Sequence, residues 1–420
     1  MMLSRRGSVF IVSLAVVAGL VAVLATVAST QRSVIRAQIN RGERVRARIA
    51  AEAAVQRAMA ELSLQEQNAP TLQTDAWYDL GRAGADRFLV GSESFRMELI
   101  DASSRINLNT ATQEQLQSLP LTTEQISALL DYRESNREAR IDGAKDEYYS
   151  NLSEPYNAKL RRFDTVDEVL QVKGFTPDVL FNPQTEFVNS ATITQGRAED
   201  RLPLYEMLTV DSYSAQTTAT GQAKLNINGG NLTASTLAER IGVSTQVAQA
   251  ILGTQTNRNR YARIGDVLAR APSNAHAAIL DNVTVNAANP VEGKININTA
   301  TEEILLTIPG LTPDVVQGIL QRQPNGGFTQ LSDILSVLGL SDLNVLQQVA
   351  DVFATSSQSF LVRAIGSVGN ASVPIEALIV IENNQPRVKQ IRDYPLDNPI
   401  ERWKWEEEAS TEVPLLEAAR

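Results

Sequence analysis

The feature that most constrains this chain is an uncharged apolar run from Ser8 to about Thr30, directly after the basic leader Arg5-Arg6-Gly7. A helix rises 1.5 Å per residue, so a run of this length spans roughly the hydrocarbon core of a bilayer. We therefore expect a transmembrane helix over residues 8–30. A cleaved secretory signal that ends near the small residues 25–28 is the alternative.

Helical patterning continues beyond the apolar run, which favours an anchor over a cleaved signal. Apolar residues recur near helical spacing at Ile35, Ile39 and Ile49, within Arg-, Glu- and Ala-rich segments that reach Leu64. We expect one helix over residues 8–67. The positive-inside rule alone would keep the rest of the chain in the cytoplasm, because more basic residues follow the span than precede it. The arginines that follow are Arg32, Arg36, Arg41, Arg44, Arg46 and Arg48.

Composition excludes several classes of site. The 420 residues include no cysteine, which rules out disulfides, thiolate metal sites and a cysteine nucleophile. The one histidine, His276, lies in a Ser-, Asn- and Ala-rich stretch where we expect a solvated side chain rather than a catalytic base. The net charge of −10 opposes attraction to phosphate backbones. We expect a structural protein, not an enzyme, that requires no cofactor.

Three related segments occur in the middle of the chain. Residues 106–111 read INLNTA, residues 295–300 read ININTA, and residues 225–228 read LNIN. Thr110 and Thr299 each have Gln or Glu three residues later, the spacing of a capping box at the start of a helix. Each segment precedes two apolar helical patterns separated by a tight turn, and then a further short helix. The pattern predicts three helix-hairpin-helix-like units, over residues 106–181, 225–270 and 295–340.

Helix-hairpin-helix units often bind DNA, so a membrane-anchored DNA-binding receptor is the main rival hypothesis. Such hairpins present the N–H groups of a Gly-x-Gly turn, and a basic residue after it, to phosphate. Here each turn has one glycine or none, and the positions that should be basic read TTE at 122–124, STQ at 244–246 and TPD at 312–314. We therefore expect a packing role for the hairpins and no nucleic-acid partner.

Strand-like alternation flanks the helical units, in residues 88–99 and again from residue 360 to residue 391. The sequence thus predicts an α+β fold with a long N-terminal transmembrane and amphipathic helix. An antiparallel sheet formed by residues 68–100 and 351–394 is interrupted by a large all-α insertion over residues 101–350. Residues 395–420 are expected to form an acidic, solvated tail.

The N-terminus resembles that of type IV pilins and pseudopilins, which have a short basic leader ending in glycine, here Gly7, and an apolar helix that starts at once, here at Ser8. Pilins usually carry Glu at the fifth mature position, where this chain has Val12. The K-type minor pseudopilins of type II secretion are the members that lack this Glu. The Asn-Thr-Ala segments, GAKDEYY at 143–149 and FDTVDEVL at 163–170 also resemble the K-type pseudopilins.

The resemblance implies residues 1–7 as a prepilin leader, prepilin peptidase cleavage between Gly7 and Ser8, and a pilin-like sheet around the insertion. It implies a single-pass inner-membrane protein with its head in the periplasm, at the tip of the pseudopilus. There it would help to initiate pseudopilus assembly and protein export across the outer membrane. The implied partners are the I-type and J-type minor pseudopilins. A minor pilin of a type IV pilus is a further alternative.

Members of the family that the chain resembles bind calcium in the helical head. Asp142, Asp146 and Glu147 offer oxygen ligands in a glycine-containing loop. Their spacing is not that of an EF-hand, and a solvated loop explains them as well. Calcium is therefore a candidate ligand of this loop and no more than that.

Overall fold

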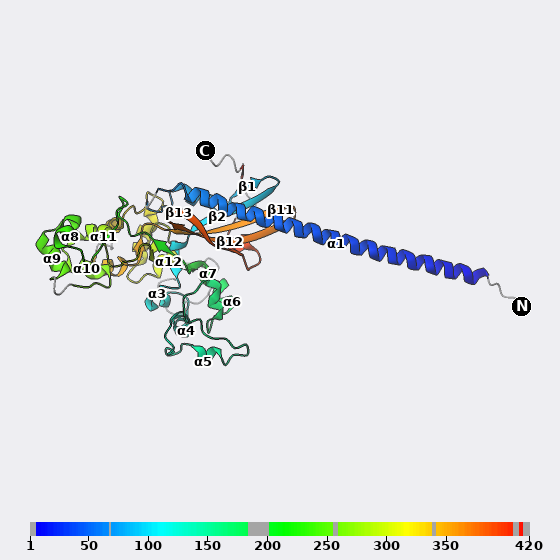
Figure 1. Ribbon diagram of the computed structural model, residues 1–420, viewed down its shortest axis with the longest axis horizontal. Coiled ribbons are helices and arrows are strands. Elements are labelled where there is room, and N and C mark those ends of the chain that lie inside the picture. Colours follow the sequence, from blue (N-terminus) through cyan, green and yellow to red (C-terminus); the bar gives the residue numbers. More distant parts are fainter. Residues whose placement is uncertain are drawn as a thin grey trace.

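The computed structural model describes residues 6–66, 69–183, 201–254, 259–337, 342–405 and 411–414. Most of the predicted leader and the acidic residues 406–408 lie outside the described residues. A single long helix, α1 (Arg6–Leu62), extends from the head toward the N-terminus (Figure 1). The remaining elements gather around the C-terminal part of α1, so that one end of the molecule is a bare helix and the other a folded head.

Helix α1 has two halves with different surroundings. Its N-terminal half contains a window of mean hydropathy 2.7, none of it buried, and within the described residues no other helix is long and apolar enough to cross a membrane. Its C-terminal half buries a stripe of small residues, including Ala47, Ala51 and Ala54, against the head. Alanine suits this stripe because it allows a close approach of the helix to a sheet without loss of helix propensity.

A six-stranded sheet lies against this half of α1, in the order β13-β12-β11-β2-β1-β14. Strands β1 to β13 of this sheet pair in antiparallel fashion, and β14 adds to β1 in parallel. Strand β2 leads into the helical insertion and β11 returns from it, so neighbours in the sheet are far apart in the sequence. The strands are β1 (Asp86–Val90), β2 (Glu93–Asp101), β11 (Ser359–Val368), β12 (Ala371–Glu382), β13 (Gln385–Asp393) and β14 (Thr411–Pro414).

Alternation along the strands divides the sheet into two faces. Phe95, Phe360 and Ile375 belong to the face that packs on α1, and all three are fully buried. Strand β11 comes closest to the helix at Gly366, where an added Cβ would lie 1.9 Å from the carbonyl oxygen of Ala47 and 2.5 Å from the amide nitrogen of Ala51. The glycine therefore permits a backbone-to-backbone contact between sheet and helix that no larger residue allows. The predicted α+β fold with an interrupted sheet is confirmed.

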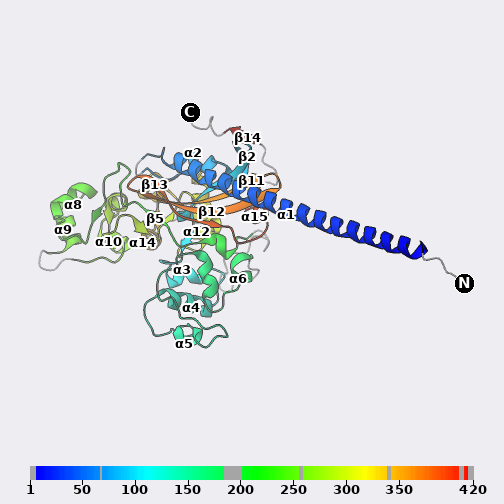
Figure 2. The ribbon, with the colours of Figure 1, turned by 45° about the vertical axis from the view of Figure 1, so that its right-hand side comes forward.

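The insertion between β2 and β11 forms three helical units, of which the middle and last pack on each other. In both views the first unit, with α3 to α5, lies to one side of the sheet, whereas α8 to α10 of the middle unit lie beyond the C-terminal end of α1 (Figures 1 and 2). The first unit contains α3 (Gln113–Gln117), α4 (Thr123–Arg133), α5 (Asp146–Tyr149), η3 (Val166–Gln171), α6 (Pro177–Phe181) and α7 (Leu204–Met207). The middle unit contains α8 (Ala234–Ile241), α9 (Thr245–Leu252), α10 (Ile264–Arg270), η5 (Ser273–Ala275) and α11 (His276–Asn282). The last unit contains α12 (Glu302–Leu306), α13 (Pro313–Arg322), η6 (Leu331–Ser336) and α14 (Leu343–Val349).

Each unit is closed by a pair of two-residue parallel strands, so the insertion is not purely helical. The opening strand holds the first Asn of the repeated segment, and the closing strand follows the last helix of the unit. The pairs are β3 (Ile106–Asn107) with β4 (Leu208–Thr209), β6 (Leu225–Asn226) with β7 (Val283–Thr284), and β9 (Ile295–Asn296) with β10 (Phe353–Ala354). The structure therefore extends each unit to a closing strand that the sequence pattern did not reveal.

The helix starts differ from the sequence prediction by two residues. Helix α3 is capped by Thr112, whose side chain accepts a hydrogen bond from the Gln115 amide in a capping box, not by Thr110. Helix α12 follows Thr301, and the hydroxyl of Thr299 instead donates to Asp101 at 2.7 Å. The helices start later because the residues before them form tight turns around the asparagines of the repeat.

The described part of the C-terminal segment, up to Trp405, is packed on the head and not solvated as the sequence predicted. After α15 (Pro399–Arg402), Trp403 and Trp405 are buried, with their ring centroids 4.8 Å apart. The Trp405 indole N–H donates to Glu98 of β2 at 2.9 Å, and an added Cβ on Gly84 would collide with its ring. Burial of two large aromatic rings is favourable because it removes apolar surface from water, even in a segment of acidic composition.

Two further short strands and turns complete the described head. Helix α2 (Ala76–Asp79) and η1 (Arg82–Gly84) lie before β1, and η2 (Ala102–Ser104) follows β2. Strands β5 (Tyr213–Ser214) and β8 (Val291–Glu292) pair in antiparallel fashion between the units. The start of the last unit lies near the end of β2, where the Asn296 side chain donates to Asp101 at 2.7 Å.

Candidate functional site

The second asparagine of each repeated segment joins three parts of its own unit. In the first unit, the Asn109 side chain donates to the carbonyl oxygens of Phe163 and Val210, each at 3.0 Å, and accepts from the Phe163 amide at 2.8 Å. Asn228 makes the equivalent contacts in the middle unit, to Tyr261 and Val285. A carboxamide suits this position because it supplies donors and an acceptor at once.

The last unit repeats the same contacts in a fully buried form. Asn298 donates to the carbonyl oxygens of Phe328 at 3.0 Å and Thr355 at 3.3 Å, and accepts from the Phe328 amide at 2.6 Å. The preceding asparagine, Asn296, accepts from the Asn298 amide and thereby forms the turn before the helix. The repeated Asn-x-Asn segment is therefore a structural clamp that ties the hairpin, the third helix and the closing strand together.

The hairpins do not offer phosphate a free helix N-terminus. At the start of α4, the Thr122 hydroxyl accepts a hydrogen bond from the Gln125 amide, and the Gln125 side-chain oxygen accepts one from the Thr122 amide. The Ser244 hydroxyl accepts from the Val247 amide at the start of α9, and α13 begins with Pro313, which has no amide hydrogen. Each hairpin turn thus has one amide of the second helix capped or missing, which reduces the donors available to phosphate.

A buried network of ion pairs joins the first unit to the sheet face opposite α1. Arg363 of β11 pairs with Glu376 of β12 at 3.2 Å and with Glu206 of α7 at 2.5 Å. Glu206 also pairs with Arg105 at 2.8 Å, so it links the sheet to the start of the first unit. Arg392 of β13 approaches Glu376 at 2.7 Å from the other side.

The charges in this network stabilise one another. Burial by itself would raise the pKa of Glu376, but the guanidinium groups of Arg363 and Arg392 outweigh it and lower this pKa below its ordinary value. The Tyr205 hydroxyl also donates to Glu376, at 2.7 Å. A buried pair is costly to break from one side, so this network fixes the orientation of the first unit on the sheet.

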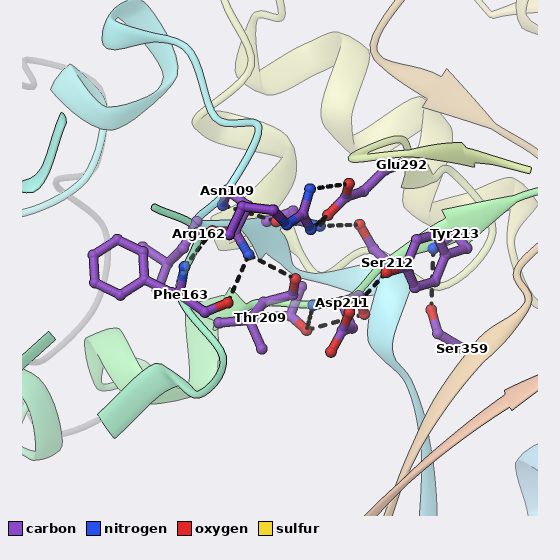
Figure 3. Close-up of polar contacts among 12 residues, drawn as sticks. Asn109, Arg162, Phe163, Thr209, Asp211, Ser212, Tyr213, Glu292 and Ser359 are labelled. Atoms are coloured by element: carbon purple, nitrogen blue, oxygen red, sulfur yellow. Dashed lines mark hydrogen bonds and ion pairs between the residues drawn. The ribbon is translucent and has the colours of Figure 1, made fainter. Parts of the chain in front are cut away.

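A second polar junction connects the first and last units (Figure 3). Glu292, just before the last unit, pairs with the Arg162 guanidinium and accepts from the Asn107 side chain at 3.2 Å. Asn107 also donates to Ser212 at 3.1 Å. Residues far apart in the sequence thus meet at one point, which the sequence pattern alone did not predict.

The same junction contacts the sheet through Tyr213. Its hydroxyl donates to Asp211 at 2.9 Å, and its amide donates to the Ser359 hydroxyl at 3.1 Å (Figure 3). Lys389 of β13 pairs with Asp211 at 2.5 Å. Every charge here has a partner, which is typical of a structural joint rather than of a catalytic centre.

The residues that the sequence singled out for the anchor lie on α1. Gly7, Ser8 and Val12 are all helical, and the Val12 side chain is 62% exposed within the bare half of the helix. Cleavage between Gly7 and Ser8 remains a prediction. His276, expected in a solvated position, is instead buried at the start of α11, with its ring nitrogen 3.1 Å from the Leu268 carbonyl oxygen.

The candidate calcium loop is organised by a carboxylate that the sequence reading did not single out. Asp131 of α4 is fully buried and accepts from the Arg140 and Ala144 amides at 3.0 and 3.1 Å. Asp146 accepts from the Ala158 amide at 2.8 Å, whereas Asp142 and Glu147 are exposed. Within the described ranges, no three acidic or histidine side chains gather closely enough to hold a metal. These residues do not fit a calcium site as they stand, and calcium at this loop remains a prediction.

Comparison with known proteins supports the resemblance read from the sequence. Residues 101–182 match the family described as type II secretion system (T2SS), protein K, and residues 291–353 match the helix-hairpin-helix motif. The fold is similar to a chain in the crystal structure of the GspK-GspI-GspJ complex from the enterotoxigenic Escherichia coli type 2 secretion system. That match has a TM-score of 0.51 and 15% sequence identity, and it covers 87% of this chain and 99% of the other. The predicted resemblance to K-type pseudopilins is confirmed.

Short segments of the chain are also similar to a group of vertebrate proteins. It is 42% identical over 66 residues to the endonuclease/exonuclease/phosphatase family domain-containing protein 1 of Xenopus laevis, which is 16% of this chain and 12% of that protein. The Homo sapiens protein of the same name is 34% identical over 84 residues, 20% of this chain and 14% of that protein. The chain spans only about an eighth of these relatives, so the match assigns no activity to it.

Proposed function

We propose that this chain, with its protein K domain and interrupted pilin-like sheet, is the minor pseudopilin at the tip of a type II secretion pseudopilus. In this role it would initiate pseudopilus assembly and assist protein export across the outer membrane. The bare half of α1 would span the inner membrane, and the head would lie in the periplasm. Such a protein would act through its contacts with other subunits and would not catalyse a chemical reaction.

The position of the insertion carries this proposal. The middle unit lies beyond the C-terminal end of α1, on the side away from the bare half of the helix (Figure 1). A fibre of pilins grows by stacking subunits along their long helices. A further subunit added above this one would meet the middle unit, whereas the space below stays open. The insertion is therefore compatible with the end of a fibre and not with its shaft.

The exposed face of α1 supports the choice of partners. Ile35 and Ile39 before the buried stripe, and Ile49 beside it, are each more than half exposed. A row of isolated apolar side chains on a long helix matches the way in which helices pack side by side. The similar solved chain belongs to a complex with GspI and GspJ. We infer that I-type and J-type minor pseudopilins pack against this face.

Co-purification of the full chain in detergent, expressed with I-type and J-type pseudopilins, tests the assembly. We expect a complex of all three proteins, and Ile39→Ser should weaken it because the substitution removes apolar area from the contact face. Arg41→Ser on the same helix is the matched control. Failure to co-purify, or equal recovery with the major pseudopilin, would exclude the tip complex.

Processing of the N-terminus offers an independent test. We propose that prepilin peptidase removes residues 1–7, because the basic leader ends directly where the apolar helix starts. N-terminal sequencing of the mature protein should find Ser8 first. A start after Ala28 would identify an ordinary cleaved signal and would refute the anchor.

The residue at position 12 gives a test that distinguishes the tip from the shaft. A tip subunit has no neighbour above to pair with an intramembrane carboxylate, so Val12→Glu should not improve secretion. An unpaired carboxylate at this depth costs about 2–4 kcal/mol on insertion scales. Val16→Glu, one helical turn further into the membrane, is the control for a simple insertion defect. Improved assembly by Val12→Glu alone would place the protein in the shaft.

A further inference from the structure

The middle and last units pack on each other as a pseudo-symmetric pair. Helix α10 of the middle unit contacts α14 of the last, and α11 of the middle unit contacts η6 of the last. In the repeat, α10 corresponds to η6 and α11 corresponds to α14. In each contact, the third helix of one unit therefore packs on the fourth helix of the other. The first unit has no such partner and packs on the sheet instead.

Each unit carries one basic and one acidic residue at fixed places in the repeat. The basic residue directly precedes the opening strand, and the acidic residue stands two positions before the closing strand. The basic residues are Arg105, Lys224 and Lys294, and the acidic residues are Glu206, Asp281 and Asp351. In the first unit the two pair directly, Arg105 with Glu206 at 2.8 Å.

In the other two units the acidic residue is diverted to the neighbouring unit. Asp351 of the last unit accepts from the Ile264 and Gly265 amides at the start of α10, at 3.0 and 3.3 Å. Asp281 of the middle unit accepts from the Ser332 amide near the start of η6 at 2.8 Å. Each carboxylate thus caps the third helix of the other unit. The two capping contacts are therefore equivalent under the pseudo-symmetry of the pair.

The exchange leaves neither lysine in a direct ion pair among the described residues, although Asp281 lies near Lys224 and Asp351 near Lys294. Lys224 donates to the Leu280 carbonyl oxygen at 2.8 Å, and Lys294 donates to the carbonyl oxygen of Asp351. Neither lysine forms an ion pair with any carboxylate in the described part of the chain. An ammonium group has three donors, so each lysine retains hydrogen-bonding capacity that a backbone carbonyl does not use.

Both lysines line one cavity of about 60 Å³ between the units. Asp281 and Asp351 line it too, with their carboxylates held by backbone amides of the opposite unit. Ser214 lines the same cavity; it is 1% exposed, and its hydroxyl has no hydrogen-bond partner among the described residues. A buried hydroxyl without a partner is uncommon and calls for a bound group or water. The cavity has room for about five water molecules, which is the size of one small oxyanion and far too small for a nucleotide.

The electrostatics of the two lysines agree with this geometry. Burial and the nearby Lys294 ammonium together lower the pKa of Lys224 to about 8, against the opposing effect of Asp281. Burial likewise lowers the pKa of Lys294, against the opposing effect of Asp351. Two cations that repel each other in a small cavity gain when an anion lies between them.

We propose that the cavity at the pseudo-symmetric contact of the middle and last units binds one small tetrahedral oxyanion, of the phosphate or sulfate class, between Lys224 and Lys294. The Ser214 hydroxyl supplies a further donor. The anion takes the place that Glu206 occupies beside Arg105 in the first unit. A lipid headgroup is excluded as its source, because the middle unit lies at the end of the molecule opposite the bare helix (Figure 1).

Isothermal titration of the full chain in detergent tests the site, with sodium phosphate, sodium sulfate and sodium acetate as separate probes at low, constant chloride. We expect saturable binding of one phosphate or sulfate per chain. Lys224→Gln and Lys294→Gln should each weaken binding about tenfold or more, because each removes a charged donor. Binding should also weaken as the pH rises through about 8, where Lys224 loses its charge.

Lys404→Gln, an exposed substitution on the C-terminal segment with the same change in charge, is the matched control and should leave binding unchanged. Lys224→Arg and Lys294→Arg keep the charge and should retain saturable binding if the glutamine variants fail to fold. No saturable heat with phosphate or sulfate at 10 mM, roughly the weakest affinity of interest, would overturn the site. Equal loss in Lys404→Gln, or acetate binding as tight as phosphate, would overturn the assignment to a tetrahedral oxyanion held by these lysines.

Discussion

Replacing Gly366 by alanine tests whether the sheet and α1 are held by direct backbone contact. The new Cβ would lie 1.9 Å from the Ala47 carbonyl oxygen, whereas real Cβ contacts are essentially never shorter than 3.0 Å. Helix and strand must therefore separate by about 1.1 Å at this point. The neighbouring atoms belong to the backbone and cannot rotate away. We expect a loss of about 1–3 kcal/mol in the free energy of unfolding, the range found for overpacked cores.

Urea unfolding of the full chain in detergent, followed by tryptophan fluorescence, measures this loss. Trp77 reports on the layer directly, since it is buried in the same cluster as the helix stripe. Gly230→Ala is the control, because a Cβ there meets nothing within 4 Å, and we expect a change within about 0.5 kcal/mol. A midpoint for Gly366→Ala that equals the wild type would refute the close approach of β11 to α1.

Three other substitutions test the clamp, the ion-pair network and the C-terminal segment. Asn298→Ala leaves the buried Phe328 amide without its acceptor and should cost about 1–3 kcal/mol in urea unfolding, whereas the exposed Asn325→Ala should cost little; equal effects would contradict the clamp. Glu376→Gln removes the buried carboxylate that Arg363 and Arg392 share, while Glu206 and Asp167 still pair with these arginines, and should cost about 1.5–3 kcal/mol at pH 7. Because the pKa of Glu376 is lowered on folding, its contribution is complete above about pH 4.5 and is lost at lower pH, so the difference between variant and wild type should shrink in acid; a constant difference would refute the charge effect. Trp405→Ala should expose the C-terminal segment to limited proteolysis before the sheet unfolds, and unchanged cleavage would contradict its docking.

Several features followed from the sequence because they depend on local patterns. The apolar run from Ser8 predicted the bare helix, since length and hydropathy suffice for a membrane span. Alternation predicted the strands on both sides of the insertion, and the repeated Asn-x-Asn segments predicted three helical units. The resemblance to K-type pseudopilins also rested on local strings, three of which, at 106–111, 143–149 and 163–170, lie inside the matched residues 101–182.

Other features depended on contacts between distant residues. The sequence indicated a solvated tail because Glu401 and its acidic neighbours dominate the composition, but Trp403 and Trp405 are buried against the sheet. Likewise His276 lies in a polar stretch and is nevertheless buried. Burial of a single large side chain is decided by what covers it, and no local pattern records that.

The repeat shows most clearly where sequence ends and tertiary structure begins. The sequence by itself predicted that an Asn-containing segment opens each helical unit, because the asparagines recur at fixed spacing; the clamp that these asparagines form came from the structure. Only the tertiary structure decided which acidic residue serves which helix. Arg105 finds Glu206 within its own unit, whereas Asp281 and Asp351 turn to the opposite unit and leave Lys224 and Lys294 facing a shared cavity. The physical reason is that a carboxylate pairs with the donors that packing brings within reach. The sequence of one unit does not show how that unit packs on another.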